Sequence, residues 1–334
     1  MQPSVSIIIP CYNEQATIGA LLSAICSQTY PLSRLEVVIA DALSEDGTRS
    51  EIGRFQRENA PLRIAIVDNP RRTIPSGLNQ AIRASSGEII VRLDAHSKPA
   101  PNYVERCVQD LDAGLGENVG GVWTIVEGGT GKVARAIAAA AAHPLGAGDA
   151  LYRLGGSARA VDTVPFGAFR RSLLDTMGGF DEQLLTNEDY EFNYRIRGAG
   201  GRVWLDPAIV SEYVARATLG ELAHQYWRYG YWKYRMLRHH PRSLRWRQAI
   251  PPILVAAMLA LAALALFLGI ARVGLVCLIV LYGLTLLAAA VDIAIRRGDI
   301  WLMPASAAAL ATMHTAWGAG FLWSAVRSTA RRDG

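Results

Sequence analysis

The sequence is poor in the cysteine patterns that mark a disulfide framework or a zinc site. Its 334 residues include four cysteines, at positions 11, 26, 107 and 277, with no short spacing between any two of them. Disulfide scaffolds and structural zinc sites both place cysteines at short, regular intervals. Neither kind of site is therefore indicated, and four scattered thiols suit a reducing compartment.

A glycine-rich phosphate loop is also missing. The turn after the first apolar run reads PCYNEQAT, which matches neither the G-x-G-x-x-G fingerprint of dinucleotide-binding proteins nor a P-loop. A nicotinamide-dependent oxidoreductase is therefore not expected. The start of the chain, MQPSVSIIIP, lacks the basic residues and the apolar core of a signal peptide, so we expect most of the chain in the cytosol.

Charged residues are nearly absent from three stretches near the C-terminus. Residues 251–271 and 273–291 contain none, and in residues 301–326 only His314 can carry a charge. A helix needs ~20 residues to cross ~30 Å of hydrocarbon, which is close to the length of each stretch. We therefore expect two to three membrane helices, in the inner (cytoplasmic) membrane.

The charge balance follows the same division of the chain. Residues 241–334 hold nine Arg and three Asp, a net charge of +6, whereas residues 1–240 hold 25 basic and 26 acidic residues, a net charge of −1. This distribution indicates lipid headgroups as partners and argues against nucleic acid. A third crossing would place Arg327, Arg331 and Arg332 outside, against the positive-inside tendency. Residues 301–326 are thus the stretch expected to lie in the interface instead.

Short β-branched runs alternate with helical patterns in the first part of the chain. This alternation predicts an α/β fold whose mixed sheet carries helices on both faces. Ligands of such sheets bind beyond the carboxyl ends of the strands. The strands are expected at residues 5–9, 35–39, 63–67, 88–93 and 119–126, and the helices at residues 15–28, 46–58 and 75–85.

Acidic side chains are expected to gather at that edge of the sheet. A lone Asp at such a place is usually a helix cap, so each residue by itself has an ordinary structural explanation. Four acidic sites together indicate a metal ion with a phosphate-bearing ligand, because a carboxylate offers a hard oxygen and an imidazole a borderline nitrogen. The sites are Glu14, Asp41, the pair Asp94 and His96, and the pair Glu188 and Asp189, which opens a helix.

The middle of the chain connects this region to the apolar stretches. Residues 131–143 are expected to form an Ala-rich helix, and the glycine-rich residues 144–159 a mobile loop. Residues 216–240 form a predicted helix in which six Tyr or Trp residues mix with Arg and Lys, which is typical of a membrane interface. We expect a cytosolic catalytic domain at 1–215, an interfacial helix region at 216–248 and a membrane domain at 249–334.

Six segments, in this order over residues 5–230, resemble the family 2 inverting glycosyltransferases that use nucleotide-sugar donors. They read SIIIPCYNE, VIADALSEDGT, GLNQAIRASSGEIIVRLDAH, FGAFRR, NEDYEFNYR and QYWRYG. RLDAH, FGAFRR and the QYWRYG helix before a short membrane tail are more specifically similar to bacterial exopolysaccharide glucosyltransferases of the succinoglycan type. The resemblance implies a GT-A type fold. It also implies transfer of a single sugar, glucose from a UDP-linked donor, to a lipid-linked acceptor such as a polyprenyl-diphosphate saccharide.

The resemblance also implies a role for individual residues. Asp189 matches the catalytic base, and Asp94 and His96 stand where the family has Asp-x-Asp, whose second Asp binds the divalent metal. His96 makes the site one negative charge poorer and better suited to Mn²⁺ than to Mg²⁺. Tyr229 replaces a Trp of the family, which argues against processive polymer synthesis. The remaining matches are donor-nucleotide contacts at Pro10, Tyr12, Glu14, Asp41 and Asp94, and acceptor or diphosphate contacts at Glu188, Gln225, Arg228 and Tyr229.

Two alternative functions stay open. A polyprenyl-phosphate sugar synthase would share the fold, although Gln225 and Arg228 favour a saccharide acceptor. A catalytically inactive membrane scaffold is a second alternative, and the intact Asp41, Asp94 and Asp189 argue against it. Other polysaccharide-assembly proteins are potential partners.

Overall fold

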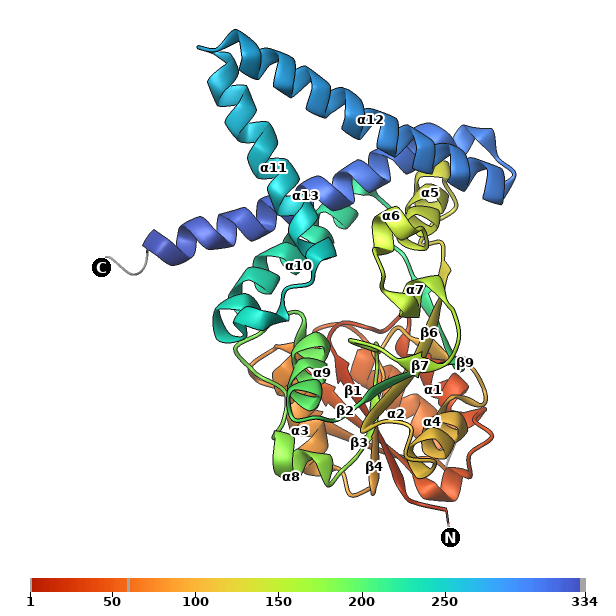
Figure 1. The fold of residues 1–334 in the computed structure, drawn as a ribbon. Helices are drawn as coiled ribbons and strands as arrows, with labels where there is room; N and C mark the ends of the chain where they lie inside the picture. The colour runs from red at the N-terminus through yellow and green to blue at the C-terminus, as the bar shows by residue number, and fades with distance from the viewer. Residues whose placement is uncertain (1, 59–60, 331–334) are drawn as a thin grey trace. The chain divides into compact units, whose positions relative to one another are not determined.

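The computed structural model describes residues 2–58 and 61–330, so Arg331 and Arg332 of the expected basic tail lie outside the described residues. The chain forms two compact units (Figure 1). The first contains residues 1–124 and 151–213, and the second residues 125–150 and 214–334. The expected functional boundaries at residues 215 and 248 stay a prediction.

Within the described residues, one mixed sheet of nine strands forms the framework of the first unit. Its parallel part has the order β3 (Arg63–Asp68), β2 (Leu35–Asp41), β1 (Val5–Cys11) and β4 (Ile89–Arg92). The strand β8 (Ala168–Arg170) then pairs antiparallel with β4 and β6 (Asn118–Val126). The strands β9 (Val203–Val214) and β5 (Lys98–Pro99) complete the order, and β7 (Arg159–Ala160) pairs with β9. The predicted mixed sheet is confirmed.

The apolar run SIIIPC explains why β1 lies inside the sheet. Ile7, Ile8 and Ile9 are all fully buried, because β1 has a strand on each side and helices on each face. Ile7 and Ile9 pack in one core with α1 (Ile18–Cys26), α2 (Thr48–Glu58) and α4 (Tyr103–Asp112). Ile8 points to the other face and packs with α3 (Ile74–Ala84) and α9 (Glu188–Gly198). Each buried Ile stabilises the fold by about 1.5–3 kcal/mol.

The glycine-rich residues 144–159 contain two short helical turns, so the prediction of a loop was wrong there. They are α6 (Pro144–Ala147) in the second unit and α7 (Leu151–Leu154) in the first. The turn at α6 forms because Pro144 suits the first helical position and the His143 side chain accepts a hydrogen bond from the Leu145 N–H. Two further short helical elements of the first unit are η1 (Leu32–Arg34) and α8 (Leu173–Met177).

The second unit is mainly helical. The expected aromatic and basic helix is α10 (Leu219–His239), and the Ala-rich helix is α5 (Lys132–Ala141). In the described part of the chain, two helices are long and apolar enough to cross a membrane. They are α11 (Trp246–Ala265), with a mean hydropathy of 2.0, and α12 (Gly269–Arg297), with 2.5. The turns η2 (Pro241–Ser243) and η3 (Ile300–Leu302) precede α11 and α13 (Met303–Ala330).

Glycines allow α13 to pack closely against α10 and α11. A side chain at Gly230 of α10 would collide with the carbonyl of Trp317, and one at Gly320 of α13 with the carbonyl of Trp227. Gly318 lies in the same way against the Pro251 carbonyl of α11. Small residues at such positions let helix backbones approach closely. The third apolar stretch is therefore a helix held by α10 and α11, and it is less apolar than either candidate span.

Candidate active site

The carboxyl ends of β1, β2 and β4 lie side by side in the sheet and carry most of the predicted donor-side residues. Pro10 lies in β1, with Tyr12 and Glu14 directly after it, and Asp41 is the last residue of β2. Asp94 and His96 follow β4, which ends at Arg92. Parallel pairing aligns Cys11 with Asp41, so these ends share one edge. The structure thus brings the segments PCYNE, DALSED and RLDAH together, as ligand sites of such sheets require.

Asp41 is fully buried and organises the loop that follows it. Its carboxylate accepts hydrogen bonds from the Ser44 N–H at 3.1 Å and the Ser44 hydroxyl at 2.5 Å, and pairs with Arg49 Nε at 2.5 Å. The Ser44 hydroxyl in turn accepts from the Asn13 N–H at 2.9 Å. Asn13 Oδ1 accepts from the Glu45 N–H at 2.9 Å. These bonds tie the two loops into one wall of the candidate donor site.

Glu14 and His96 are joined directly. His96 Nδ1 lies 2.9 Å from Glu14 Oε1, and the Glu14 N–H donates to Thr48 Oγ1 at 2.8 Å. A carboxylate accepts only, so Nδ1 carries a proton, and in the neutral imidazole the lone pair is on Nε2. A carboxylate that orients a histidine in this way commonly supports a metal ligand. The contact was not predicted from the sequence, which assigned the two residues separate roles.

The buried Arg92 collects the remaining carboxylates. Its side chain is 4% exposed at the end of β4. Nη2 donates to Asp94 Oδ1 at 3.1 Å and to Glu188 Oε1 at 2.9 Å, and Nη1 donates to Asp189 Oδ1. Glu188 and Asp189 stand in the first turn of α9, as predicted, where the helix dipole favours negative charge. One guanidinium therefore connects the strand exit with the start of α9.

The electrostatics of this cluster depend on burial and on the excess of carboxylates over cations. Burial raises the pKa of Asp189. The charge of Arg92 lowers this pKa, whereas the charges of Glu188 and Asp94 raise it. Together these effects leave the pKa of Asp189 at about 7. Burial would lower the pKa of Arg92, but Asp189, Asp94 and Glu188 hold it above its ordinary value. Arg92 therefore stays charged, while Asp189 changes charge near neutral pH. A carboxylate with such a pKa can accept a proton from a substrate.

Exposure separates the two acidic residues of α9. The Asp189 side chain is 26% exposed, whereas that of Glu188 is 9% exposed. Asn187 before them adopts a left-handed backbone with φ of 72°, which Asn tolerates better than most residues. The turn thus presents Asp189 to a ligand more than Glu188.

Three predicted residues lie in the second unit. Gln225, Arg228 and Tyr229 belong to α10, where Gln225 Nε2 donates to the Tyr229 hydroxyl at 3.0 Å. The rings of Tyr226 and Tyr229 have centroids 5.6 Å apart. The Gln and the aromatic ring therefore form one surface feature on a helical face, and their role toward an acceptor stays a prediction.

The residues present fit a divalent cation that is shared with a phosphate ligand. Within the described residues, no three His, Cys, Asp or Glu side chains are grouped to hold a metal ion. Asp94 and His96 offer two ligands, and a cation of the Mg²⁺ or Mn²⁺ type commonly takes one or two protein ligands together with substrate phosphates and water. The ligand set thus suits an ion that arrives with a diphosphate.

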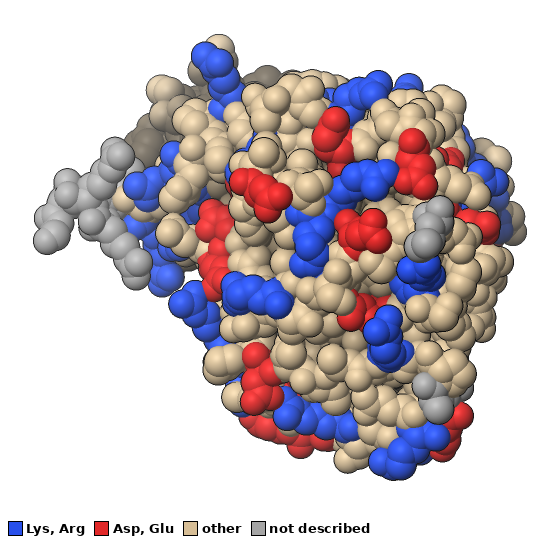
Figure 2. Space-filling view, turned by 90° about the horizontal axis from the view of Figure 1, so that it is seen from below, with Lys and Arg blue, Asp and Glu red and all other residues tan. Residues whose placement is uncertain are grey.

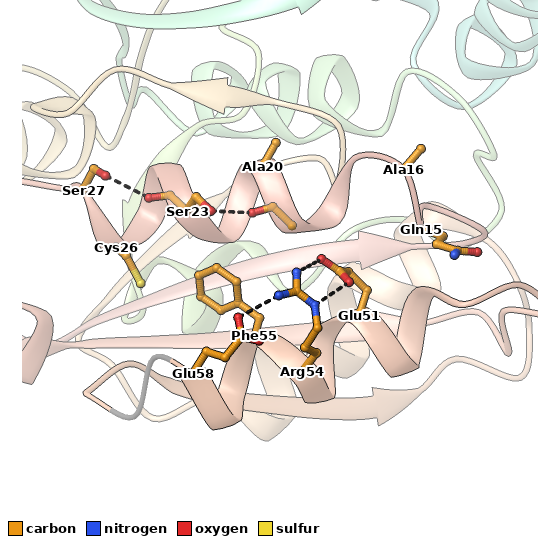
Figure 3. Close-up of a pocket in the computed structure, with 11 residues that line it drawn as sticks. Gln15, Ala16, Ala20, Ser23, Cys26, Ser27, Glu51, Arg54, Phe55 and Glu58 are labelled. Atoms are coloured by element: carbon orange, nitrogen blue, oxygen red, sulfur yellow. Dashed lines mark hydrogen bonds and ion pairs between the residues drawn. The ribbon is translucent and has the colours of Figure 1, made fainter.

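A hollow between α1 and α2 is not this site (Figure 3). It has a volume of about 540 Å³ and includes Gln15, Phe55 and Arg54 in its lining. Arg54 is bonded to Glu51 and Glu58, which also line the hollow. None of the predicted site residues is among its lining.

Charged side chains of both signs lie on the surface. Figure 2 shows Lys and Arg side chains interspersed with Asp and Glu on one face of the molecule. This mixture matches the near balance of charge in residues 1–240.

Sequence reasoning assigned no function to Arg92. The signal that could have identified it is its place directly after the apolar run GEIIV. A charged residue in a buried strand is rare unless it is paired with an opposite charge. Its partner Asp94 is two residues away in the sequence. Its partners Glu188 and Asp189 are nearly 100 residues away, and only the fold brings them close to Arg92.

The sequence resembles known proteins of one family. The family model described as "Glycosyl transferase family 2" matches residues 6–178. The chain is 32% identical over 333 residues to the succinoglycan biosynthesis protein ExoA of Rhizobium meliloti, which covers 98% of this chain and 96% of the relative. Over 249 residues it is 26% identical to a dolichyl N-acetyl-α-D-glucosaminyl phosphate 3-β-D-2,3-diacetamido-2,3-dideoxy-β-D-glucuronosyltransferase of Methanococcus voltae, covering 72% of this chain and 76% of the relative.

A solved structure shows the same fold. The mannosyltransferase PcManGT from Pyrobaculum calidifontis, in complex with GDP-Man and Mn²⁺, superimposes with a TM-score of 0.63 at 24% identity, over 94% of this chain and 87% of that chain. The mixed sheet with its carboxylates at the strand ends is thus that of a glycosyltransferase with a GT-A-like fold. The chain belongs to glycosyltransferase family 2.

Proposed function

We propose that the protein transfers one glucose from UDP-glucose to a membrane lipid-linked saccharide, with inversion at the anomeric carbon. The observation that carries the proposal is that Asp94 and Asp189 both accept hydrogen bonds from Arg92 at the carboxyl edge of the sheet. One carboxylate serves the donor side and the other the acceptor side. The relative named for succinoglycan biosynthesis supports a role in polysaccharide assembly.

The loops after β1 and β2 hold the nucleoside of the donor in this proposal. Tyr12 is exposed next to Pro10 and has the Arg72 guanidinium 5.6 Å from its ring centroid, so it presents an aromatic surface to a base. Asp41 fixes the second loop through Ser44 and Arg49. Glu14 completes this wall through its bond to His96.

Asp94 and His96 would hold a divalent cation on the donor diphosphate, Mn²⁺ in preference to Mg²⁺. When bound, the ion stabilises the negative charge that develops on the departing diphosphate, as a Lewis acid does, by several kcal/mol. The preference for Mn²⁺ follows from the imidazole ligand, because nitrogen suits Mn²⁺ better than Mg²⁺. The structural relative with Mn²⁺ in its complex supports the same choice.

The chemistry requires one bond to form and one to break. The acceptor hydroxyl oxygen attacks the anomeric carbon while Asp189 takes the hydroxyl proton. The bond from that carbon to the diphosphate oxygen breaks, and its electron pair leaves with the nucleoside diphosphate. Attack and departure on opposite sides of the carbon invert its configuration.

In this proposal the second unit binds the acceptor and attaches the protein to the membrane. Gln225, Arg228 and Tyr229 would contact the acceptor or the diphosphate, and the acceptor would be a polyprenyl-diphosphate saccharide. The relative named for a dolichyl-linked sugar phosphate supports a polyprenyl-linked acceptor in general. We place the protein in the inner membrane with the catalytic unit in the cytosol, near other polysaccharide-assembly proteins. A reporter fused after Gly334 tests whether residues 301–326 lie in the interface, as we propose: cytosolic activity is expected, and activity only in the periplasm would show a third crossing.

The test of function is an assay of purified protein with a panel of UDP- and GDP-sugars, a lipid-linked saccharide extract, and Mn²⁺. Nucleotide release from UDP-glucose that depends on the saccharide is expected. Release with a polyprenyl phosphate alone would instead identify a polyprenyl-phosphate sugar synthase. Silence across the panel, with folded protein, would indicate an inactive scaffold.

A further inference from the structure

Arg92 has a position that ordinary strand packing does not explain. Ile89, Ile90 and Val91 of β4 are fully buried apolar residues, and Arg92 ends the strand with its side chain buried as well. Its N–H donates to the Gly167 carbonyl at 3.1 Å. The N–H of the next residue, Leu93, donates to the Ile8 carbonyl at 3.1 Å. The backbone is therefore fixed between two neighbouring strands, and a buried cation is costly unless it is fully paired.

The two Nη atoms of Arg92 bond different carboxylates. Nη1 bonds Asp189, and Nη2 bonds both Asp94 and Glu188. A planar guanidinium fixes the directions of its donors, so the two carboxylates it joins are fixed relative to each other. A lysine would offer a single flexible charge and could not impose the same geometry.

The third nitrogen of the Arg92 guanidinium, Nε, makes no such bond to the described residues. Arg92 Nε is buried and has no hydrogen-bond partner among the described residues. An unsatisfied buried donor is destabilising. Arg92 thus adopts a conformation in which both Nη atoms bond carboxylates, although Nε has no partner among the described residues.

We infer that Arg92 is a positioning residue that acts through Asp189, holding the base at a fixed place relative to Asp94. The inference rests on the proposed function, in which Asp189 accepts the proton of the acceptor. Arg92 also faces Asp94 and Glu188, and Tyr103 of α4 lies near enough to interact electrostatically with Asp189. Of these neighbours, Arg92 is the cation that opposes protonation of the base.

A second arginine in the same unit supplies a matched control. Arg195 of α9 bonds the buried Glu191 at 2.6 Å and also donates to the carbonyls of Met177 and Gly179. Like Arg92, it pairs with a buried carboxylate of α9. These three partners are not among the predicted site residues, so replacement of Arg195 measures the cost of losing a structural ion pair.

The test compares Arg92→Met, Arg92→Lys and Arg195→Met in the full-length enzyme, with kcat, KM for the donor and thermal unfolding as measurements. Arg92→Met is expected to lower kcat by about 10-fold or more and to change KM for the donor by a smaller factor, because a misplaced base slows transfer while the other proposed donor contacts remain. Arg92→Lys should keep the charge but recover only part of kcat. Arg195→Met should lower the unfolding temperature and leave kcat near that of the unmodified enzyme.

A double variant separates action through Asp189 from independent action. In an Asp189→Asn background, Arg92→Met should lower kcat by less than about 2-fold further, since residues that act as a unit are not additive. An equal loss in both backgrounds, or an unchanged kcat in Arg92→Met, would overturn the inference. If Arg92→Met does not fold, the same comparison is made with Arg92→Lys. Full activity of Asp189→Asn alone would instead refute the proposed base, whatever Arg92 does.

Discussion

The two units of the molecule differ in the groups that they bury and expose. The first unit buries a guanidinium among three carboxylates at the end of a central strand. The second exposes long apolar surfaces on α11 and α12. Polar contacts lie at the two ends of this helix pair that are not joined, where Arg247 near the start of α11 pairs with Asp149 and Asp292 near the end of α12 contacts His143. The first unit thus gathers buried carboxylates at its candidate site, whereas the second unit exposes apolar surface on the two helices that could cross a membrane.

The largest expected effect falls on Asp189, the most reactive member of the buried cluster. Asp189→Asn keeps the size of the side chain and removes its basicity, so transfer should fall by about 10²-fold or more while donor binding persists. Glu188→Gln should lose less, because Glu188 is the more buried of the two. Transfer rates and donor affinities of both variants check this. Near-normal transfer by Asp189→Asn with an inactive Glu188→Gln would reverse the assignment.

The donor side of the same cluster should respond to the metal. His96→Ala should weaken the binding of Mn²⁺ with UDP and lower transfer, while His96→Asp should restore part of the activity and extend it toward Mg²⁺. Calorimetric titration of Mn²⁺ in the presence of UDP measures binding apart from turnover. His143→Ala in the second unit is the control, and its metal response should be unchanged. Full metal-dependent activity of His96→Ala would leave Asp94 as the sole protein ligand.

The pH dependence of transfer should report the raised pKa of Asp189. The base acts in its ionised form, so the rate should rise with pH through about 7, the pKa that burial gives Asp189. An ordinary carboxylate would already be ionised near pH 5. Removal of Arg92 takes away the charge that lowers this pKa, so the rise should move to higher pH in Arg92→Met. A rate that is flat from pH 5 to pH 8 would show that another group accepts the proton.

The smallest expected effect concerns packing in the second unit. Gly230→Ala places a methyl group against the Trp317 carbonyl, whereas Gly220→Ala on the same helix meets nothing within 4 Å. Gly230→Ala should therefore lower the thermal stability by about 1–3 kcal/mol. Gly220→Ala should be neutral or slightly stabilising, because Ala favours helix. Equal unfolding temperatures for the two variants would show that α10 and α13 do not pack closely.

The sequence predicted elements more successfully than contacts. The strand and helix positions of the first unit could be read from periodicity, because runs such as SIIIP and LEVVIAD are buried on both faces. The grouping of acidic residues followed from the rule that parallel strands end at one edge. The Arg92 cluster and the bond from Glu14 to His96 could not be read in this way. Both depend on residues more than 80 positions apart that only tertiary packing brings together.

The shape of the second unit shows the same limit. Composition identified three apolar stretches, and their hydropathy alone does not say which of them packs against α10. That follows from the positions of Gly230, Gly318 and Gly320 relative to backbone carbonyls of neighbouring helices. Helix partners depend on which face each glycine occupies, and that is fixed only when the helices are assembled.

The configuration of the product tests the central claim most directly. In the proposed mechanism the acceptor, deprotonated by Asp189, attacks opposite the departing diphosphate, so a single displacement takes place. With α-linked UDP-glucose as donor, the anomeric proton of the product should show the coupling of a β-glucoside by NMR. An α-glucoside would contradict the account, because retention cannot arise from one displacement with Asp189 as the base.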